Sequence, residues 1–98
     1  MPHVRLSARA QSDLSRLHAF LLKKDATAAK RAVLAIREAF MPLKHSPMIG
    51  RPVEDRDDLR ELVIDFGASG YLAMYRFEPP LNAVTILAIK HQREDDYR

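Results

Sequence analysis

The stretch that decides the fold is Ala83–Tyr97, which reads A-V-T-I-L-A-I-K-H-Q-R-E-D-D-Y. Its first part, through Ile89, is a β-branched apolar run with the length and composition of a buried strand. The run leads directly into a polar cluster of Lys90, His91, Gln92, Arg93, three acids and Tyr97. We therefore expect the central strand of a sheet, ending in side chains suited to recognition or chemistry.

Length and composition set the broad class of the protein. The chain has 98 residues, near the usual size of one core, so the sequence predicts a single domain over residues 1–98. Its 47% hydrophobic and 30% charged residues are typical of a soluble globular protein. The lack of cysteine excludes disulfides and thiolate metal sites and fits a reducing cytoplasm. No segment has the apolar length of a secretory signal or a membrane span, so we expect no membrane partner.

Charge is divided unevenly between the two halves of the chain. Residues 1–50 carry nine Lys or Arg and three acids, a net charge of +6, whereas residues 51–98 carry seven and ten, a net charge of −3. A basic first half can meet an acidic protein or a nucleic acid. The same charges also fit the solvated faces of two helices, because they are spread out and few aromatic residues interleave them.

The first half predicts a short strand and a helical hairpin. His3 to Ser7 alternates as a strand does, and Ser7 is a suitable N-cap for the helix that follows. The apolar stripe of this helix comprises Ala10, Leu14, Leu17 and Leu21, with Asp13, Arg16 and Lys23 off it. Asp25 is the expected cap of a second helix, whose stripe comprises Ala29, Val33, Ile36, Phe40 and Leu43. Pro42 should end or kink this second helix.

The second half predicts a long loop and an antiparallel meander. Prolines, Gly50 and several aspartates make 44–58 a loop, and its acids lack the spacing of a calcium site. Strands follow at 59–66, 71–77 and 83–91, with a four-residue hairpin loop at 67–70 and a second turn at 78–82. The fold class is therefore α+β: a four-stranded sheet with two helices packed on one face and the other face open to a partner.

Several motifs, in this order, resemble those of the RelE/ParE superfamily of bacterial type II toxins. They are S-A-R-A-Q-S-D-L at 7–14, P-M-I-G-R-P at 47–52, L-R-E-L at 59–62, G-Y-L-A-M-Y at 70–75 and A-I-K-H-Q-R-E-D-D-Y at 88–97. The resemblance covers nearly the whole chain. It implies a small toxin, encoded beside an antitoxin that wraps and neutralises it, and hence a hetero-oligomer with that antitoxin.

The resemblance implies two possible activities. RelE-like members cut mRNA on the ribosome with basic residues on the sheet and often a C-terminal tyrosine, whereas ParE-like members poison DNA gyrase and lack that set. Placed on this sequence, the two strand lysines of the RelE pattern fall at Val63 and Asp65. Its two arginines fall at Leu72 and His91, and only the tyrosine matches, at Tyr97. An apolar residue or an acid cannot stabilise the negative charge of a phosphate in the transition state.

The candidate site residues each have two interpretations. His91 with Arg93 and Tyr97 forms the catalytic set if the protein is a nuclease, since His can act as acid or base near neutral pH. Alternatively, His91 is a strand-end residue bonded to the tail, Arg93 pairs with Glu94, Asp95 or Glu61, and Tyr97 packs over the sheet edge. Arg60, Arg76, Arg93 and Tyr97 are the candidate partner-binding residues, with ion pairs to Glu61 or Glu78 as the alternative for Arg60 and Arg76.

The sequence thus favours a ParE-like inhibitor of DNA gyrase, with the first helical hairpin and the C-terminal tail as the contacting surfaces. An mRNA endonuclease acting on the ribosome and an inactive toxin that only binds its antitoxin are the alternatives. We expect the antitoxin to add an amphipathic helix or strand to the open apolar surface and its acidic segment to neutralise the basic helices. No cofactor motif is present, and the scattered histidines form no metal-binding pair.

Overall fold

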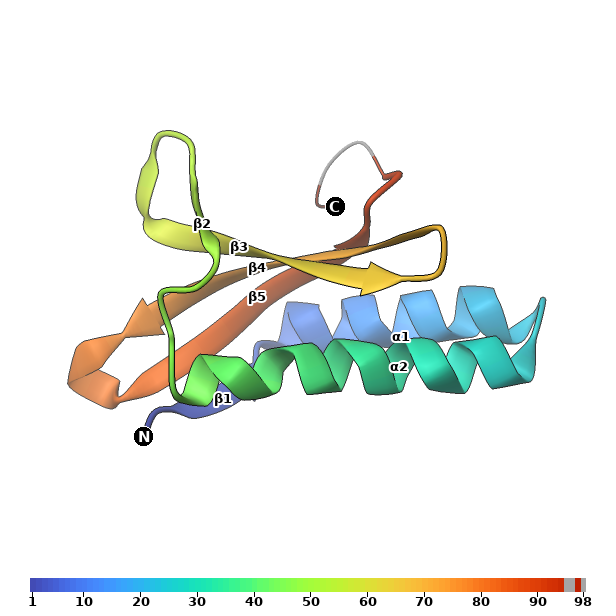
Figure 1. Ribbon diagram of the computed structural model, residues 1–98, viewed down its shortest axis with the longest axis horizontal. Coiled ribbons are helices and arrows are strands. Elements are labelled where there is room, and N and C mark those ends of the chain that lie inside the picture. The colour runs from blue at the N-terminus through green and yellow to red at the C-terminus, as the bar shows by residue number, and fades with distance from the viewer. Residues whose placement is uncertain (95–96, 98) are drawn as a thin grey trace.

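The computed structural model describes residues 1–94 and 97 and has two layers, a sheet and a helical hairpin (Figure 1). The helices are α1 (Ala8–Leu22) and α2 (Ala26–Phe40), followed by a short 3₁₀ turn, η1 (Met41–Lys44). A second 3₁₀ turn, η2 (Pro79–Leu81), precedes the last strand. The strands are β1 (His3–Leu6), β2 (Arg51–Val53), β3 (Arg56–Phe66), β4 (Ser69–Glu78) and β5 (Ala83–His91).

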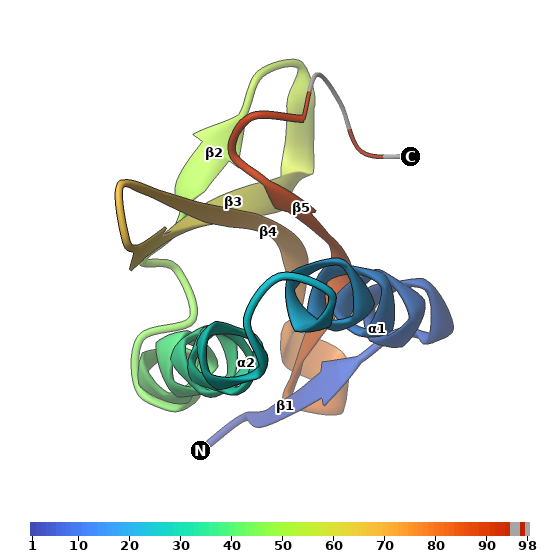
Figure 2. The same ribbon diagram turned by 90° about the vertical axis from the view of Figure 1, so that its right-hand side faces the viewer.

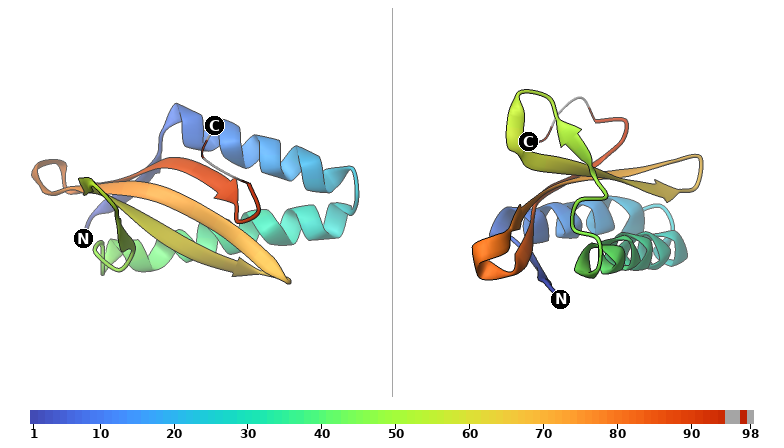
Figure 3. Two further views of the ribbon diagram at one scale, coloured as in Figure 1. Left: turned by 90° about the horizontal axis from the view of Figure 1, so that it is seen from above. Right: turned by 60° about the vertical axis from the view of Figure 1, so that its left-hand side comes forward.

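The strands form one mixed sheet in the order β1-β5-β4-β3-β2. β1 runs parallel to β5, and the other neighbouring pairs are antiparallel. Both helices lie on the same side of this sheet (Figure 2), and seen from above the strands cross the helix pair obliquely (Figure 3). The α+β class and the helices on one face are confirmed. We call the sheet face opposite the helices the open face.

Two sequence-based expectations about the sheet are wrong in detail. It has five strands rather than four, because Arg51–Val53 forms a short edge strand within the stretch expected to be a loop. Pro52 is tolerated there because an edge strand has one side without ladder partners. β5 is an interior strand, as expected, but β4 is the middle one.

The hairpin between β3 and β4 is tighter than expected. Phe66 pairs with Ser69, so the turn has two central residues, Gly67 and Ala68, rather than four. Gly67 has φ +63°, a left-handed conformation that favours glycine and suits the twist of a two-residue hairpin. β3 also begins earlier than expected, at Arg56, because it pairs with β2.

The helices begin where the sequence predicts. The Ser7 side chain accepts the N–H of Ala10 at 3.0 Å, and Asp25 accepts the N–H groups of Thr27 and Ala28 at 2.9 and 3.2 Å. These caps satisfy backbone donors that have no partner inside the helix. α2 ends at Phe40, just before Pro42, as a proline there requires.

The core lies between the helices and one face of the sheet. Its buried members from the helices are Ala10, Leu14, Leu17, Ala32, Ile36 and Phe40, and from the sheet Ile64, Tyr71, Ala73, Tyr75, Val84, Ile86 and Ile89. Burying such side chains contributes about 1.5–3 kcal/mol each for the larger ones. No helix in the described part of the chain has the length and apolar character needed to cross a membrane.

Candidate functional site

The C-terminal candidates are split between the two faces of the sheet. His91 pairs with Tyr71, whose ring lies in the core beside the helices, and the two rings meet edge to face at 5.4 Å. Lys90, the preceding residue, points to the open face, where its Nζ lies 5.1 Å from the centroid of the Tyr97 ring. Alternate residues of a strand face opposite ways, so His91 and Tyr97 are not brought together.

Both ring nitrogens of His91 are engaged. Nδ1 accepts the backbone N–H of Arg93 at 3.1 Å, and Nε2 lies 3.1 Å from the hydroxyl oxygen of Ser69. Because a neutral imidazole carries one proton, acceptance at Nδ1 leaves that proton on Nε2, which then donates to Ser69. His91 therefore cannot act as a base toward Ser69 in this arrangement, and the pair is not a nucleophile and its base.

Tyr97 and Lys90 are tied to their neighbours on the open face. The Tyr97 hydroxyl donates to Glu61 Oε2 at 2.8 Å, and the other oxygen of Glu61 accepts from Arg51 Nε at 3.0 Å. The Lys90 ammonium donates to the backbone carbonyl of Glu94 at 3.1 Å, and Lys90 is only 9% exposed. Glu94 and Tyr97 of the tail thus cover the lysine that β5 presents to this face.

The candidate arginines differ in their surroundings. Arg60 Nη1 donates to the backbone carbonyls of Met48 and Gly50 at 3.0 and 2.7 Å. Arg76 pairs with Glu78 at 3.6 Å and with Asp58 at 4.0 Å, which matches its ion-pair alternative. Arg93 is exposed and makes no ion pair with the described residues, whereas its suggested partner Asp95 lies outside them.

A ladder of charged side chains crosses the open face from β1 to β3. Arg5 Nε donates to Thr85 Oγ1 at 2.9 Å, and Thr85 donates in turn to Glu78 at 3.0 Å. The hydrogen bond from Thr85, with the charges of Arg76 and Arg5, holds the pKa of Glu78 below its usual value. At the β3 end, the pKa of Asp58 is lowered chiefly by its hydrogen bond from Arg56.

The part of the open face that leads to the β3–β4 turn is apolar and acidic. Val63, 48% exposed, stands directly opposite Leu72, and Asp65 stands opposite Gly70. Three of the positions that carry cations in the RelE-like pattern therefore hold no positive charge, and two of them are neighbours in space. Within the described residues, no cluster of His, Asp or Glu has the composition of a metal site.

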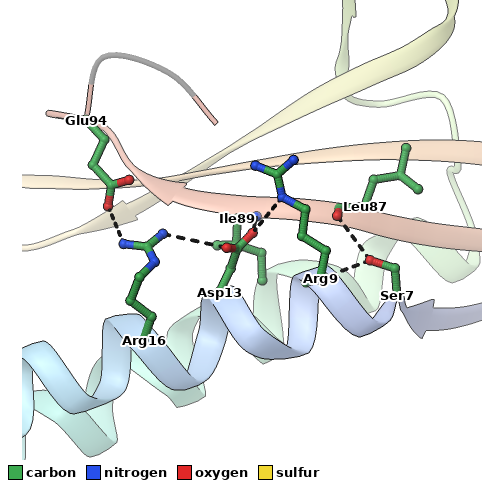
Figure 4. Close-up of polar contacts among 8 residues, drawn as sticks. Ser7, Arg9, Asp13, Arg16, Leu87, Ile89 and Glu94 are labelled. Atoms are coloured by element: carbon green, nitrogen blue, oxygen red, sulfur yellow. Dashed lines mark hydrogen bonds and ion pairs between the residues drawn. The ribbon is translucent and has the colours of Figure 1, made fainter. Parts of the chain in front are cut away.

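Asp13 is a buried acid of this region, although its position off the apolar stripe of α1 did not predict burial (Figure 4). It was expected on the solvated side of α1, yet it is 7% exposed and accepts the backbone N–H of Ile89 at 2.9 Å. Arg9 and Arg16 lie 3.7 Å from its carboxylate oxygens. The signal in the sequence was one acid with arginines at i−4 and i+3, which share its side of the helix.

These contacts close the edge of β5 beyond the end of β1. β1 pairs with β5 only as far as Ile86, and the Ser7 hydroxyl then donates to the carbonyl of Leu87 at 3.0 Å. Arg16 continues the series by pairing with Glu94 at 2.8 Å, which joins α1 to the tail. We call this set of contacts the α1–β5 seam.

A groove runs between α1 and α2 and continues to β1. Its larger part, 440 Å³, is lined by Leu14, Ser15, His18, Lys30, Val33, Leu34 and Arg37. A second part of 360 Å³ shares Leu14, Ser15 and Arg37 and adds Val4, Arg5, Leu6 and Gln11. The groove thus has an apolar floor with basic side chains along its rim. We call it the helix groove.

The fold recurs in solved toxin structures. The chromosomal ParDE toxin–antitoxin system of P. aeruginosa matches with a TM-score of 0.78 at 23% identity, over 93% of this chain and 96% of that one. The intact E. coli RelBE toxin–antitoxin complex matches with a TM-score of 0.66 at 14% identity, over 96% of this chain and 100% of that one. These likenesses define the fold class as that of the RelE/ParE toxins.

Sequence comparison then gives the family. The model for the ParE toxin of the type II toxin–antitoxin system parDE matches residues 4–96. Toxin RelE3 of Caulobacter vibrioides is 38% identical over 95 residues, which cover 96% of this chain and 98% of the relative. Toxin RelE1 of the same organism is 37% identical over 73 residues, covering 74% and 76%. The chain belongs to the ParE toxin family and is the toxin of a type II toxin–antitoxin system.

Proposed function

We propose that this toxin is a ParE-like inhibitor of DNA gyrase, which binds the enzyme and traps its cleaved complex with DNA. The observation that carries the proposal is the distribution of positive charge on the open face. Cutting RNA requires cations placed where negative charge develops on the phosphate. On this face Arg5, Arg51, Arg56 and Arg76 each lie against a carboxylate, and Lys90 is covered by the tail.

The placement of the tail residues supports the same proposal. His91 and Tyr97 lie on opposite faces of the sheet, so neither can assist the other at one phosphate. The tautomer of His91 is fixed by a backbone N–H, and its second nitrogen is occupied by Ser69. General acid–base catalysis needs such groups within hydrogen-bond reach of the same reacting atoms.

An mRNA endonuclease acting on the ribosome is the second candidate. It is favoured by the name of the 38% identical relative, Toxin RelE3, and by His91 and Arg93 near the chain end. A toxin that only binds its antitoxin is the third candidate, because an antitoxin can bind in the helix groove whether or not the toxin acts on another target.

Purified toxin added to a gyrase supercoiling reaction separates these functions. We expect supercoiling to stop and covalent gyrase–DNA cleavage products to accumulate. In cells, induction should trigger the SOS response and gyrase-dependent DNA breaks before translation slows. His91→Ala should keep full activity, and adding the antitoxin should abolish it.

The contrary results are equally definite. Rapid arrest of translation with mRNA cut at the ribosomal A site, lost in His91→Ala, would establish the endonuclease and overturn the gyrase proposal. A toxin that leaves both supercoiling and translation intact but binds its antitoxin tightly would be the inactive form.

The antitoxin interaction is proposed for the helix groove. An amphipathic helix that lays its apolar side along the groove would cover Leu34, which is 48% exposed, and the partly exposed Val33, beside the buried Leu14. Acidic side chains along that helix would meet Lys30 and Arg37 on the rim. This placement fits the positive charge of the first half of the chain.

A further inference from the structure

The loop between η1 and β2 is held by hydrogen bonds with two side chains of the sheet. The hydroxyl of Tyr75, a residue with no exposed surface, donates to the carbonyl of Pro47 at 2.8 Å and accepts the N–H of Gly50 at 2.8 Å. Arg60 reaches the same loop from β3 and donates to the carbonyls of Met48 and Gly50. Four hydrogen bonds from two side chains therefore fix the backbone on both sides of Ile49.

Gly50 shows how closely the loop is seated. A Cβ atom at this position would stand 2.6 Å from Cε1 of Tyr75 and 2.9 Å from the carbonyl oxygen of Glu61. Both distances are shorter than the contacts that Cβ atoms make in proteins, so the approach of the loop to the sheet requires glycine. The loop backbone is therefore fixed before any partner binds.

The side chains that this fixed backbone presents are apolar and exposed. Met48 is 55% exposed and Ile49 is 51% exposed, and they are consecutive residues. Neither residue lines the helix groove, so the site proposed for the antitoxin does not account for them. Single exposed apolar residues are common on proteins, but two on a fixed loop lose little conformational entropy on binding.

We propose that Met48 and Ile49 are the anchor with which this toxin binds gyrase, inserting into an apolar pocket with an acidic rim on the enzyme. The inference rests on the proposed function. The acidic rim follows from the basic side chains that precede the pair: residues 39–50 contain Lys44 and His45 but no acid, whereas Arg51 is already paired with Glu61. Arg60 and Tyr75 act as positioning residues for the anchor.

The test uses a double variant that carries both Met48→Ser and Ile49→Ser. Its control is the single variant Leu81→Ser. Leu81 is 57% exposed on η2 and belongs to no site proposed above, so it controls for the loss of exposed apolar surface. Thermal unfolding should be nearly unchanged in both proteins, because the replaced side chains are exposed. The double variant should need about tenfold or more toxin to half-inhibit supercoiling, as for an interface anchor, whereas Leu81→Ser should match the wild type.

Arg60→Met adds a readout of positioning. It keeps Met48 and Ile49 but removes the hydrogen bonds to the Met48 and Gly50 carbonyls, so inhibition should weaken several-fold while antitoxin binding is retained. Unchanged inhibition by the double variant would overturn the anchor, and so would loss of antitoxin binding with inhibition intact. If the wild-type toxin itself fails to inhibit gyrase, the proposed function is wrong. If the wild-type toxin inhibits gyrase and the variants inhibit it equally well, only the anchor is wrong.

Discussion

The carboxylate of Asp13 in α1 accepts the backbone N–H of Ile89 in β5 at 2.9 Å. A helix side chain thus takes the place of a neighbouring strand where β1 has ended. A buried backbone donor without a partner is costly, so the contact explains why an acid is buried between α1 and β5. Arg9 and Arg16 on either side balance its charge.

We expect Asp13→Ala to lower the free energy of unfolding by about 2 kcal/mol, because it leaves the buried Ile89 N–H without its acceptor and removes the carboxylate between Arg9 and Arg16. Urea unfolding followed by circular dichroism measures the change. Asp13→Asn keeps an acceptor oxygen and should lose clearly less. A loss below about 0.5 kcal/mol for Asp13→Ala, the range of ordinary surface substitutions, would show that the seam is not a stabilising contact.

Tyr75→Phe should destabilise the protein by about 1–2 kcal/mol, because one hydroxyl serves both the Pro47 carbonyl and the Gly50 N–H. Tyr71→Phe is the matched control: Tyr71 is equally buried, but its hydroxyl makes no hydrogen bond with the described residues. Thermal unfolding of both variants measures the difference. Equal effects of the two substitutions would contradict the assigned role of the Tyr75 hydroxyl.

The charge ladder predicts a dependence of stability on pH. The pKa of Glu78 is lower in the folded protein than its ordinary value of 4.5, chiefly through the hydrogen bond from Thr85. Its contribution is therefore complete above the ordinary value and is lost as the pH falls through the folded pKa. Glu78→Gln should flatten the fall in stability below about pH 4.5, measured by urea unfolding across pH. If the stability of Glu78→Gln falls at low pH as steeply as that of the wild type, other carboxylates govern this pH dependence.

Arg37 lines both parts of the helix groove, so it tests where the antitoxin binds. Arg37→Glu should weaken antitoxin binding about tenfold or more, because it replaces attraction to an acidic helix with repulsion. Titration calorimetry with the purified antitoxin measures the affinity. Arg93→Glu, which lies on the tail away from the groove, is the control. Equal loss in both variants would indicate a general charge effect rather than binding in the groove.

Local signals in the sequence determined much of the fold. Ser7 and Asp25 cap the helices because their side chains accept neighbouring N–H groups, and this requires only residues nearby in the chain. The apolar stripes of the helices and the run from Val84 to Ile89 specify which sides are buried, because helix and strand have fixed periods. The family resemblance, now confirmed, rests on motifs in the same order.

The candidate site was determined less completely. The sequence predicts that the last strand ends at His91, and the structure confirms this end, but the sequence does not say that Tyr97 lies over the open face, away from the His91 ring. Pairing of Arg5 with Glu78 or of Asp13 with Ile89 joins residues more than seventy positions apart. Such contacts depend on how the strands and helices pack, which no local pattern encodes.

The sequence by itself therefore determined the elements, their buried sides and the family, through local hydrogen bonds and periodic apolar spacing. The tertiary structure alone decided that the arginines of the open face meet carboxylates, that the tail covers Lys90, and that a fixed loop presents Met48 and Ile49. The physical reason is that charge pairing and exposure depend on distances across the sheet. Those distances exist only once the chain has folded.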